Sequence, residues 1–215
     1  RERKSMQKSF KFAVTVGRNE NADLEKLAQI WAEKFNVKYV ERGSKGSLKF
    51  LLGREQVDAL LVATNQGPQV YSASGTFFFH PSMAVLRAQR LKKYEPDHFV
   101  AALELKPGMK VLDCTMGLAS DAIVASFITG GEGVVCAVEA SPLLHFVVSE
   151  GLKNYQAEDI DLNSAMRRIT TVCAEAETYL AALPADSFDV VYFDPMFRIP
   201  VNGSSNMEPL RPLAW

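Results

Sequence analysis

The stretch Lys110-Val-Leu-Asp-Cys-Thr-Met-Gly-Leu-Ala-Ser-Asp121 decides the fold class of this chain. Its first residues begin an apolar strand of the kind that is buried in a sheet, and a loop with one glycine, Gly117, follows. Residues 119–129 then have the composition of a helix, which ends at Gly130-Gly131. A strand that leads through a short loop into a helix predicts a β-α-β unit and therefore a parallel sheet.

The same alternation continues on both sides of this stretch. The predicted elements are a helix at 81–93, strands at 134–138, 169–173 and 190–193, and helices at 142–155 and 175–183. Strands that alternate with helices imply right-handed crossovers between parallel neighbours. The predicted fold class is therefore α/β, with a Rossmann-like sheet.

The first part of the chain has the pattern of a smaller α/β unit. Alternating apolar residues over 10–16 indicate a strand, and an apolar stripe over 24–35 indicates a helix that Asn21 or Asp23 caps. Residues 37–40 favour a second strand, residues 48–52 and 59–63 are short apolar runs, and Gly67-Pro68 marks a turn. We expect residues 1–76 to form an N-terminal α/β subdomain and residues 77–215 the main domain.

Four consecutive predicted strands end on or next to an acidic residue. These residues are Asp113, Glu139, Glu175 with its neighbour Ala176, and Asp194. In open parallel sheets, ligands bind beyond the carboxyl ends of the strands. The shared position of these acids is the main sequence evidence for a ligand site.

The loop after the first of these strands indicates the chemistry of the ligand. Gly117 permits a tight turn and a close approach of a ligand to the backbone. A dinucleotide site would have more glycines here to admit a pyrophosphate. Asp113 and Asp121 at the two ends of the loop instead suit a cationic ligand with an amino group, such as the sulfonium S-adenosylmethionine. An ordinary β-α turn is the alternative interpretation.

Two further acids fit the same ligand. Glu139 lies 26 residues after Asp113, near the offset at which an acid binds ribose hydroxyls. Glu175 could accept a hydrogen bond from an adenine amino group, or it could simply favour the start of the helix that follows. For Glu139, a solvated acid at a strand end is the alternative.

The sequence Asp194-Pro-Met-Phe197 follows the last predicted strand and is the sharpest signal in the chain. The Asp194 carboxylate and the Pro195 carbonyl could accept hydrogen bonds from an NH₂ group, so that the nitrogen lone pair points at a methyl donor. Phe197 could stack on a planar ring, as aromatic side chains do on bases. The alternative is an Asp-Pro turn followed by a core phenylalanine.

Three segments together resemble one known family. Asp113 to Asp121, Val138-Glu-Ala-Ser-Pro142 and Tyr192-Phe-Asp-Pro-Met-Phe197 are similar to the family of the bacterial 16S ribosomal RNA guanine-N2 methyltransferase called RsmJ. The resemblance covers most of residues 80–200. It implies a class I methyltransferase fold, S-adenosylmethionine as cofactor, and ribosomal RNA or the small ribosomal subunit as partner. The positions that match the family's cofactor contacts are Ser120-Asp121, Glu139-Ala140, Glu175-Ala176 and Asp194.

The chain departs from the family pattern in three places. The family's first loop usually reads Gly-Leu-Gly-Arg-Asp, where this chain has Gly117-Leu-Ala-Ser-Asp121. A Lys-rich stretch of the family is replaced by residues 198–206, which contain no lysine. A class I sheet usually has three more strands than the four predicted here, so we expect the main domain to be C-terminally incomplete.

Bulk composition narrows the choice of partners and location. The chain has 24 Lys and Arg against 25 Asp and Glu, so its net charge gives no global case for nucleic acid. Arg87, Arg90 and Lys93 could hold RNA phosphates, although a solvated helix face is the plainer interpretation. The three cysteines lack metal-binding spacing, no apolar run approaches the ~20 residues of a membrane span, and a cytoplasmic location without a metal is expected.

Two alternative functions remain open on the sequence alone. One is a methyltransferase that acts on a small molecule or a protein, which the balanced charge would favour. The other is a module that binds S-adenosylmethionine or a nucleotide without catalysis. The acceptor and the oligomeric state are not determined by the sequence.

Overall fold

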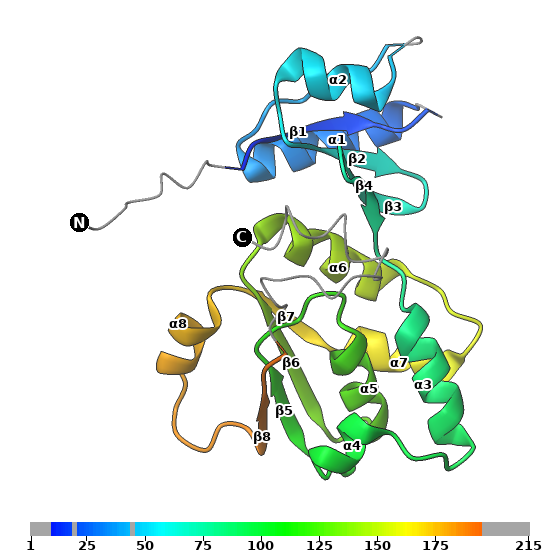
Figure 1. Cartoon of the computed structure of the whole chain (residues 1–215), viewed down its shortest axis with the longest axis vertical. Coiled ribbons are helices and arrows are strands. Elements are labelled where there is room, and N and C mark those ends of the chain that lie inside the picture. Colours follow the sequence, from blue (N-terminus) through cyan, green and yellow to red (C-terminus); the bar gives the residue numbers. More distant parts are fainter. Residues whose placement is uncertain (1–9, 19–20, 44–45, 195–215) are drawn as a thin grey trace. The chain divides into compact units, whose positions relative to one another are not determined.

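The computed structural model describes residues 10–18, 21–43 and 46–194 (Figure 1). The described residues fall into two compact units, one that ends at Phe78 and one that begins at Phe79. In the described part of the chain, no helix is both long and apolar enough to cross a membrane.

The first unit is a four-stranded mixed sheet with two helices. Its elements are β1 (Phe12–Val16), α1 (Ala22–Phe35), α2 (Leu48–Glu55), β2 (Ala59–Thr64), β3 (Gly67–Ser72) and β4 (Gly75–Phe78). The strand order is β1-β2-β3-β4, in which β1 and β2 run parallel and the other pairs run antiparallel. The predicted α/β character of this part is confirmed.

The two helices of this unit bury opposite faces of the sheet. Ala13, Leu60 and Val62 pack in one cluster with Leu51 of α2. Because side chains alternate along a strand, the residues between them point to the other face, which α1 covers with buried residues such as Trp31. Of the two predicted caps of α1, Asn21 is the one used, and its side chain accepts a hydrogen bond from the Leu24 N–H at 2.8 Å.

Two details of the first unit differ from the sequence expectation. The predicted strand at 37–40 was wrong, because Tyr39 forms only an isolated bridge, with Val14 of β1. Gly67-Pro68 begins β3 rather than marking the turn, which the two preceding residues form. The apolar run 48–52, to which the sequence assigned no element, belongs to helix α2.

The second unit is a parallel sheet with helices between its strands. Its elements are α3 (Ser82–Lys92), α4 (His98–Ala102), β5 (Lys110–Asp113), α5 (Ser120–Thr129), β6 (Val134–Glu139), α6 (Pro142–Asn154), α7 (Ile160–Arg168), β7 (Thr170–Cys173), α8 (Ala176–Ala181) and β8 (Val190–Tyr192). The strand order is β7-β6-β5-β8, and each neighbouring pair is parallel. Counted from β5, this order corresponds to the 3-2-1-4 part of a Rossmann-like sheet and confirms the predicted fold class.

Most elements of the second unit were predicted, and two short helices were not. Helices α4 and α7 are each nine residues long or shorter and lie in segments that the strand-helix alternation did not require. Figure 1 shows β5, β6 and β7 side by side, with β8 beside β5. Because all four strands run in one direction, their carboxyl ends lie along one edge of the sheet.

Candidate active site

The carboxyl edge of the second sheet brings the four predicted acids to one side of the unit. Asp113 is the last residue of β5 and Glu139 the last of β6. Glu175 comes two residues after β7, and Asp194 two residues after β8. Since β6 and β8 flank β5, the acids of these three strands lie on neighbouring strand ends.

The loop after β5 folds back over the end of β6. Gly117 adopts a positive φ of +48°, and its N–H donates to Glu139 Oε2 at 3.1 Å. The Met116 N–H donates to the Val138 carbonyl at 2.9 Å. Ala119, which stands where the family usually has glycine, is buried at a φ of +60°, a region that favours glycine. The loop thus keeps the left-handed turn despite the substitution.

Glu139 is held in place by backbone groups on both sides. Its Oε1 accepts from the Ser141 N–H at 2.9 Å, and its Oε2 accepts from Gly117. Burial raises the pKa of Glu139, and these hydrogen bonds oppose the rise. A carboxylate has about four acceptor sites, so these backbone bonds leave some acceptor capacity for the hydroxyls of a ribose.

Asp113 lies beneath the loop rather than at its surface. It is only 3% exposed, and its Oδ1 accepts from the Thr115 N–H at 2.9 Å. Burial, together with the nearby charges of Asp121 and Asp194, raises the pKa of Asp113 to about 7, although the hydrogen bonds from Thr115 oppose the rise. Asp113 therefore shapes the loop and sets the electrostatics of the site from below.

Asp121 belongs to an ion-pair network that the sequence did not reveal. Arg87 Nη1 donates to Asp121 Oδ1 at 2.5 Å, and the same guanidinium binds Asp97 through Nε (2.7 Å) and Nη2 (2.9 Å). The Tyr192 hydroxyl donates to Asp121 Oδ2 at 3.2 Å. Burial disfavours the charge of Arg87, but the bonds to Asp97 and Asp121 outweigh it and raise the pKa of Arg87.

This network corrects both sequence interpretations of Arg87. The side chain is neither a phosphate ligand nor part of a solvated face, because both carboxylates engage it and its Cζ lies 5.2 Å from the centre of the Phe99 ring. Arg90 and Lys93 of the same stretch are exposed. No local signal could have paired Arg87 with Asp121, since 34 residues separate them.

Asp194 is exposed at the mouth of the same edge. Its backbone N–H donates to Thr115 Oγ1 at 2.7 Å, which ties the exit of β8 to the loop after β5. Burial and the charges of Asp121 and Asp194 raise the pKa of Tyr192, two residues before it. Pro195 and Phe197, the other predicted acceptor-binding residues, lie outside the described residues.

The remaining predicted contacts lie around this edge. Ser120 is the first residue of α5 and is half-buried, and Ala140 is exposed directly after β6. Glu175 is exposed before α8, where its side chain makes no capping hydrogen bond, and Ala176 begins that helix. Glu175 lies close enough to Glu139 for its charge to raise the pKa of Glu139.

Comparison with known proteins identifies the family. A family model described as "Putative SAM-dependent methyltransferase" matches residues 77–206. The protein YpiP of Bacillus subtilis (strain 168) is 38% identical over 190 residues, which cover 88% of this chain and 73% of that protein. Ribosomal RNA small subunit methyltransferase J of Rhodopseudomonas palustris (strain HaA2) is 34% identical over 97 residues, 44% of this chain and 42% of that protein.

A solved structure supports the same fold. The S-adenosylmethionine-dependent methyltransferase NGO1261 from Neisseria gonorrhoeae matches with a TM-score of 0.60 at 16% identity, over 86% of this chain and 70% of that one. The residues at the carboxyl edge fit the cofactor, because Glu139 keeps free acceptor sites and acids surround the place for a cationic ligand. The chain therefore belongs to the family described as putative S-adenosylmethionine-dependent methyltransferases, and S-adenosylmethionine is its cofactor.

Proposed function

We propose that this enzyme methylates the exocyclic amine of a guanine in ribosomal RNA. The observation that carries the proposal is the place of Asp194, exposed at a strand end and bonded through its backbone to the loop after β5. The resemblance of Asp194-Pro-Met-Phe197 to the RsmJ family and the ribosomal RNA methyltransferases among its relatives support it. Those relatives match over less than half of their own length, so the acceptor is an inference.

We assign the cofactor contacts to the carboxyl edge. Glu139 would accept from the ribose hydroxyls, and Glu175, whose side chain makes no capping bond, would accept from the adenine amino group. Ser120 and Asp121 would hold the amino-acid end, with Asp113 beneath them. Backbone groups of Gly117, Ala140 and Ala176 complete the assignment.

The chain's own residues would then orient the acceptor. When bound, the cofactor would supply to the acceptor nitrogen a methyl group on a sulfonium, whose leaving group is a neutral thioether. The Asp194 carboxylate and the Pro195 carbonyl would accept from the guanine NH₂, while Phe197 would stack on the ring. The amine loses a proton after the transfer. No strong base is needed first, so orientation provides most of the acceleration.

The cofactor assignment is tested by calorimetric titration of S-adenosylmethionine into the wild type and a Glu139→Ala variant. We expect about a tenfold to hundredfold loss of affinity, because charge-assisted hydrogen bonds contribute about 1.5–3 kcal/mol. Glu132→Ala, an exposed glutamate in the turn before β6, is the control and should bind normally. Equal affinity in all three proteins would refute the role of Glu139.

The acceptor assignment is tested with radiolabelled S-adenosylmethionine and small ribosomal subunits that lack the modification. Wild type should label the RNA, and Asp194→Asn should lose at least about a hundredfold in rate, the scale of a positioning hydrogen-bond group in transfer chemistry. Label on a small molecule or protein instead would favour the alternative acceptor. Cofactor binding without transfer to any of these would indicate a binding module. A ribosomal substrate would also place the enzyme in the cytoplasm, as we propose.

A further inference from the structure

Charge is divided unequally between the two units. Residues 1–78 contain 13 Lys and Arg against eight Asp and Glu, a formal balance of +5, whereas residues 79–215 contain 11 against 17, a balance of −6. The second unit holds the candidate active site and would repel a polyanion. Because affinity for RNA depends largely on phosphate neutralisation, the charge balance favours the first unit as its main source.

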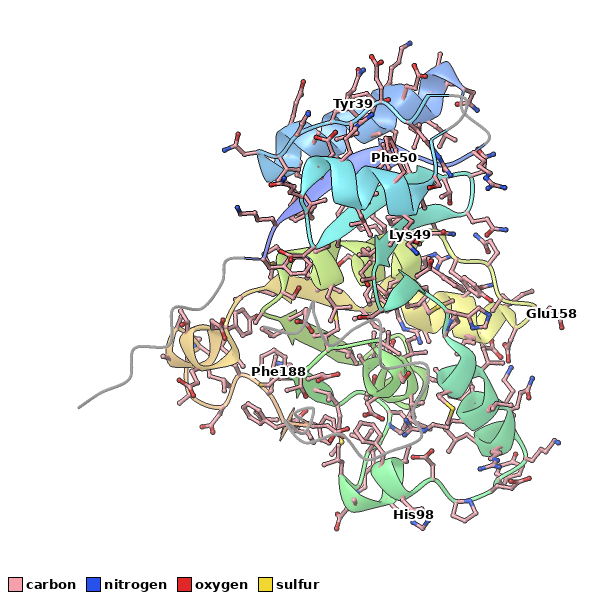
Figure 2. The ribbon with its side chains drawn as sticks, turned by 45° about the horizontal axis from the view of Figure 1, so that its top comes forward. Tyr39, Lys49, Phe50, His98, Glu158 and Phe188 are labelled. Carbon is pink, nitrogen blue, oxygen red and sulfur yellow. The ribbon has the colours of Figure 1, made fainter. Side chains whose placement is uncertain are left out.

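Within the first unit, helix α2 has an outward face that its fold does not explain. Leu48, Leu51 and Leu52 pack on the sheet. The opposite face carries Lys49, Phe50, Gly53 and Arg54, all exposed, and Figure 2 labels Lys49 and Phe50 on this helix. We call these four residues the α2 face. Phe50 is 60% exposed, an unusual position for a large apolar ring.

The residues next to Phe50 include basic side chains, as at surfaces that bind nucleic acids. The Arg54 Cζ lies 5.9 Å from the centre of the Phe50 ring, and Lys49 is the adjacent residue. Glu55 is the acid nearest in the chain, and its carboxylate is already engaged by Lys38 and Arg54 Nε, each at 2.7 Å. Lys38 and Arg54 thus offset the charge of the one nearby acid, and Arg54 also lies over the exposed ring. Single-stranded nucleic acids are bound by such combinations of stacking rings and cations.

Gly53 provides an independent observation. Glycine inside a helix costs about 0.5–1 kcal/mol relative to alanine. A Cβ at Gly53 would meet nothing within 4 Å, so packing does not require glycine here. What glycine does provide is a bare stretch of backbone one turn from Phe50 and Lys49, over which a flat base can approach closely.

We propose that the α2 face binds a single-stranded segment of the RNA substrate, with Phe50 stacked on a base and Lys49 and Arg54 on phosphates. This inference rests on the proposed function and adds the surface that holds the substrate. It assigns RNA affinity to the first unit and the chemistry to the second.

The test measures the affinity of the 215-residue chain for a fluorescein-labelled single-stranded RNA. The RNA has about 16 nucleotides, the longest stretch that one small single-strand-binding domain usually covers. Phe50→Ala should weaken binding about tenfold. Lys49→Gln with Arg54→Gln should reduce the slope of log affinity against log salt by about 1–1.5, because each lost phosphate contact removes about 0.7. S-Adenosylmethionine affinity should stay unchanged in both.

Gly53→Ala separates binding from folding. The added methyl should raise the thermal midpoint, since it fills open space on a helix, and yet weaken RNA binding. The controls are Lys26→Gln and Ile30→Ala on the exposed face of α1, across the sheet from α2, and both should bind RNA normally.

The outcomes separate this inference from the proposed function. RNA binding that is equal in the wild type and all α2 variants would overturn the α2 face while leaving RNA methylation standing. Cofactor binding without any RNA binding by the wild type would overturn both. If Phe50→Ala lost self-association but kept RNA binding, the partner of the α2 face would be a second copy of the chain and not RNA.

Discussion

At the scale of single residues, burial decides what each acid of the site does. Glu139 and Asp113 both end a strand, and the sequence treated them alike. Glu139 keeps part of its carboxylate accessible with backbone donors on each oxygen, whereas Asp113 is almost completely enclosed. An enclosed carboxyl disfavours its charged form. Acidic residues at equivalent strand ends thus differ: Glu139 is the one that we propose as a ligand acceptor, and Asp113 is a buried support.

Asp113 gives a prediction about the pH dependence of stability. Its pKa is about 7 in the fold and near 3.9 unfolded, so the folded state binds the extra proton between these values. Its contribution to the free energy of unfolding is therefore present below pH 4 and falls as pH rises to 7. The loss reaches about 4 kcal/mol, from roughly three pKa units at about 1.4 kcal/mol each.

Asp113→Asn should remove this dependence of the free energy of unfolding on pH. The amide keeps an oxygen for the Thr115 N–H but has no charge to bury. Urea denaturation from pH 5 to 8 should show that the variant gains stability relative to the wild type as pH rises. If the free energy of unfolding changed with pH in the same way in both proteins, the pKa of Asp113 in the fold would be that of an ordinary aspartate.

At the scale of elements, capping and periodicity explain most helices, including one that the sequence reading missed. In α7, Asp159 accepts from the Asp161 and Leu162 N–H groups, and Leu162, Ala165 and Met166 are buried at helical spacing. This signal was present in the sequence and could have found the helix. The single bridge at Tyr39 has no such signal, because its partner Val14 belongs to a segment 25 residues earlier in the chain.

Two helical glycines lead to opposite predictions for one substitution. A Cβ at Gly151 in α6 would overlap the ring of Phe79, which is buried, whereas a Cβ at Gly53 in α2 would meet nothing. Gly151→Ala should therefore lower the free energy of unfolding by about 1–3 kcal/mol despite better helix propensity. Gly53→Ala should raise it by about 0.5–1 kcal/mol. Chemical denaturation of both variants checks the pair, and the same sign for both would contradict the packing argument.

At the scale of the whole molecule, the second unit is tied together by contacts between distant segments. Arg87 of α3 joins Asp97 before α4 to Asp121 of α5, and Tyr192 of β8 meets the same carboxylate. The ring of Tyr192 packs edge-on against Phe99, 4.9 Å between centres. The position of Asp121 in the site is thus set by three elements outside its own helix.

Arg87→Met should destabilise this unit by about 2–4 kcal/mol, because it leaves two largely enclosed carboxylates without their cation. The hydrogen bond from Arg87 holds the pKa of Asp97 below its ordinary value. The stabilisation from the Arg87–Asp97 ion pair is therefore present above about pH 4 and is lost as pH falls through the lowered pKa of Asp97. Urea denaturation should show a difference in the free energy of unfolding between wild type and variant at pH 7, and this difference should become smaller near pH 3.

Arg90→Met is the matched control for this prediction. Arg90 lies on the same helix but its side chain is 70% exposed, with a glutamate at 3.9 Å, so its loss should change stability by less than about 1 kcal/mol. If the difference in the free energy of unfolding between wild type and Arg87→Met stayed constant with pH, Arg87 would stabilise the unit through packing and not through its charge.

The sequence by itself determined the elements of the sheet and the acids at their ends, because side-chain periodicity, capping residues and a single loop glycine act over a few neighbouring residues. It also carried the family resemblance, since Asp113 to Asp121 and Asp194-Pro-Met-Phe197 are contiguous. Only the tertiary structure decided the burial of Asp113, the capture of Arg87 by two carboxylates, and the bond from Asp194 to Thr115. Each depends on the order of strands in the sheet, which places side chains up to 79 residues apart in contact and is set by packing of the whole unit.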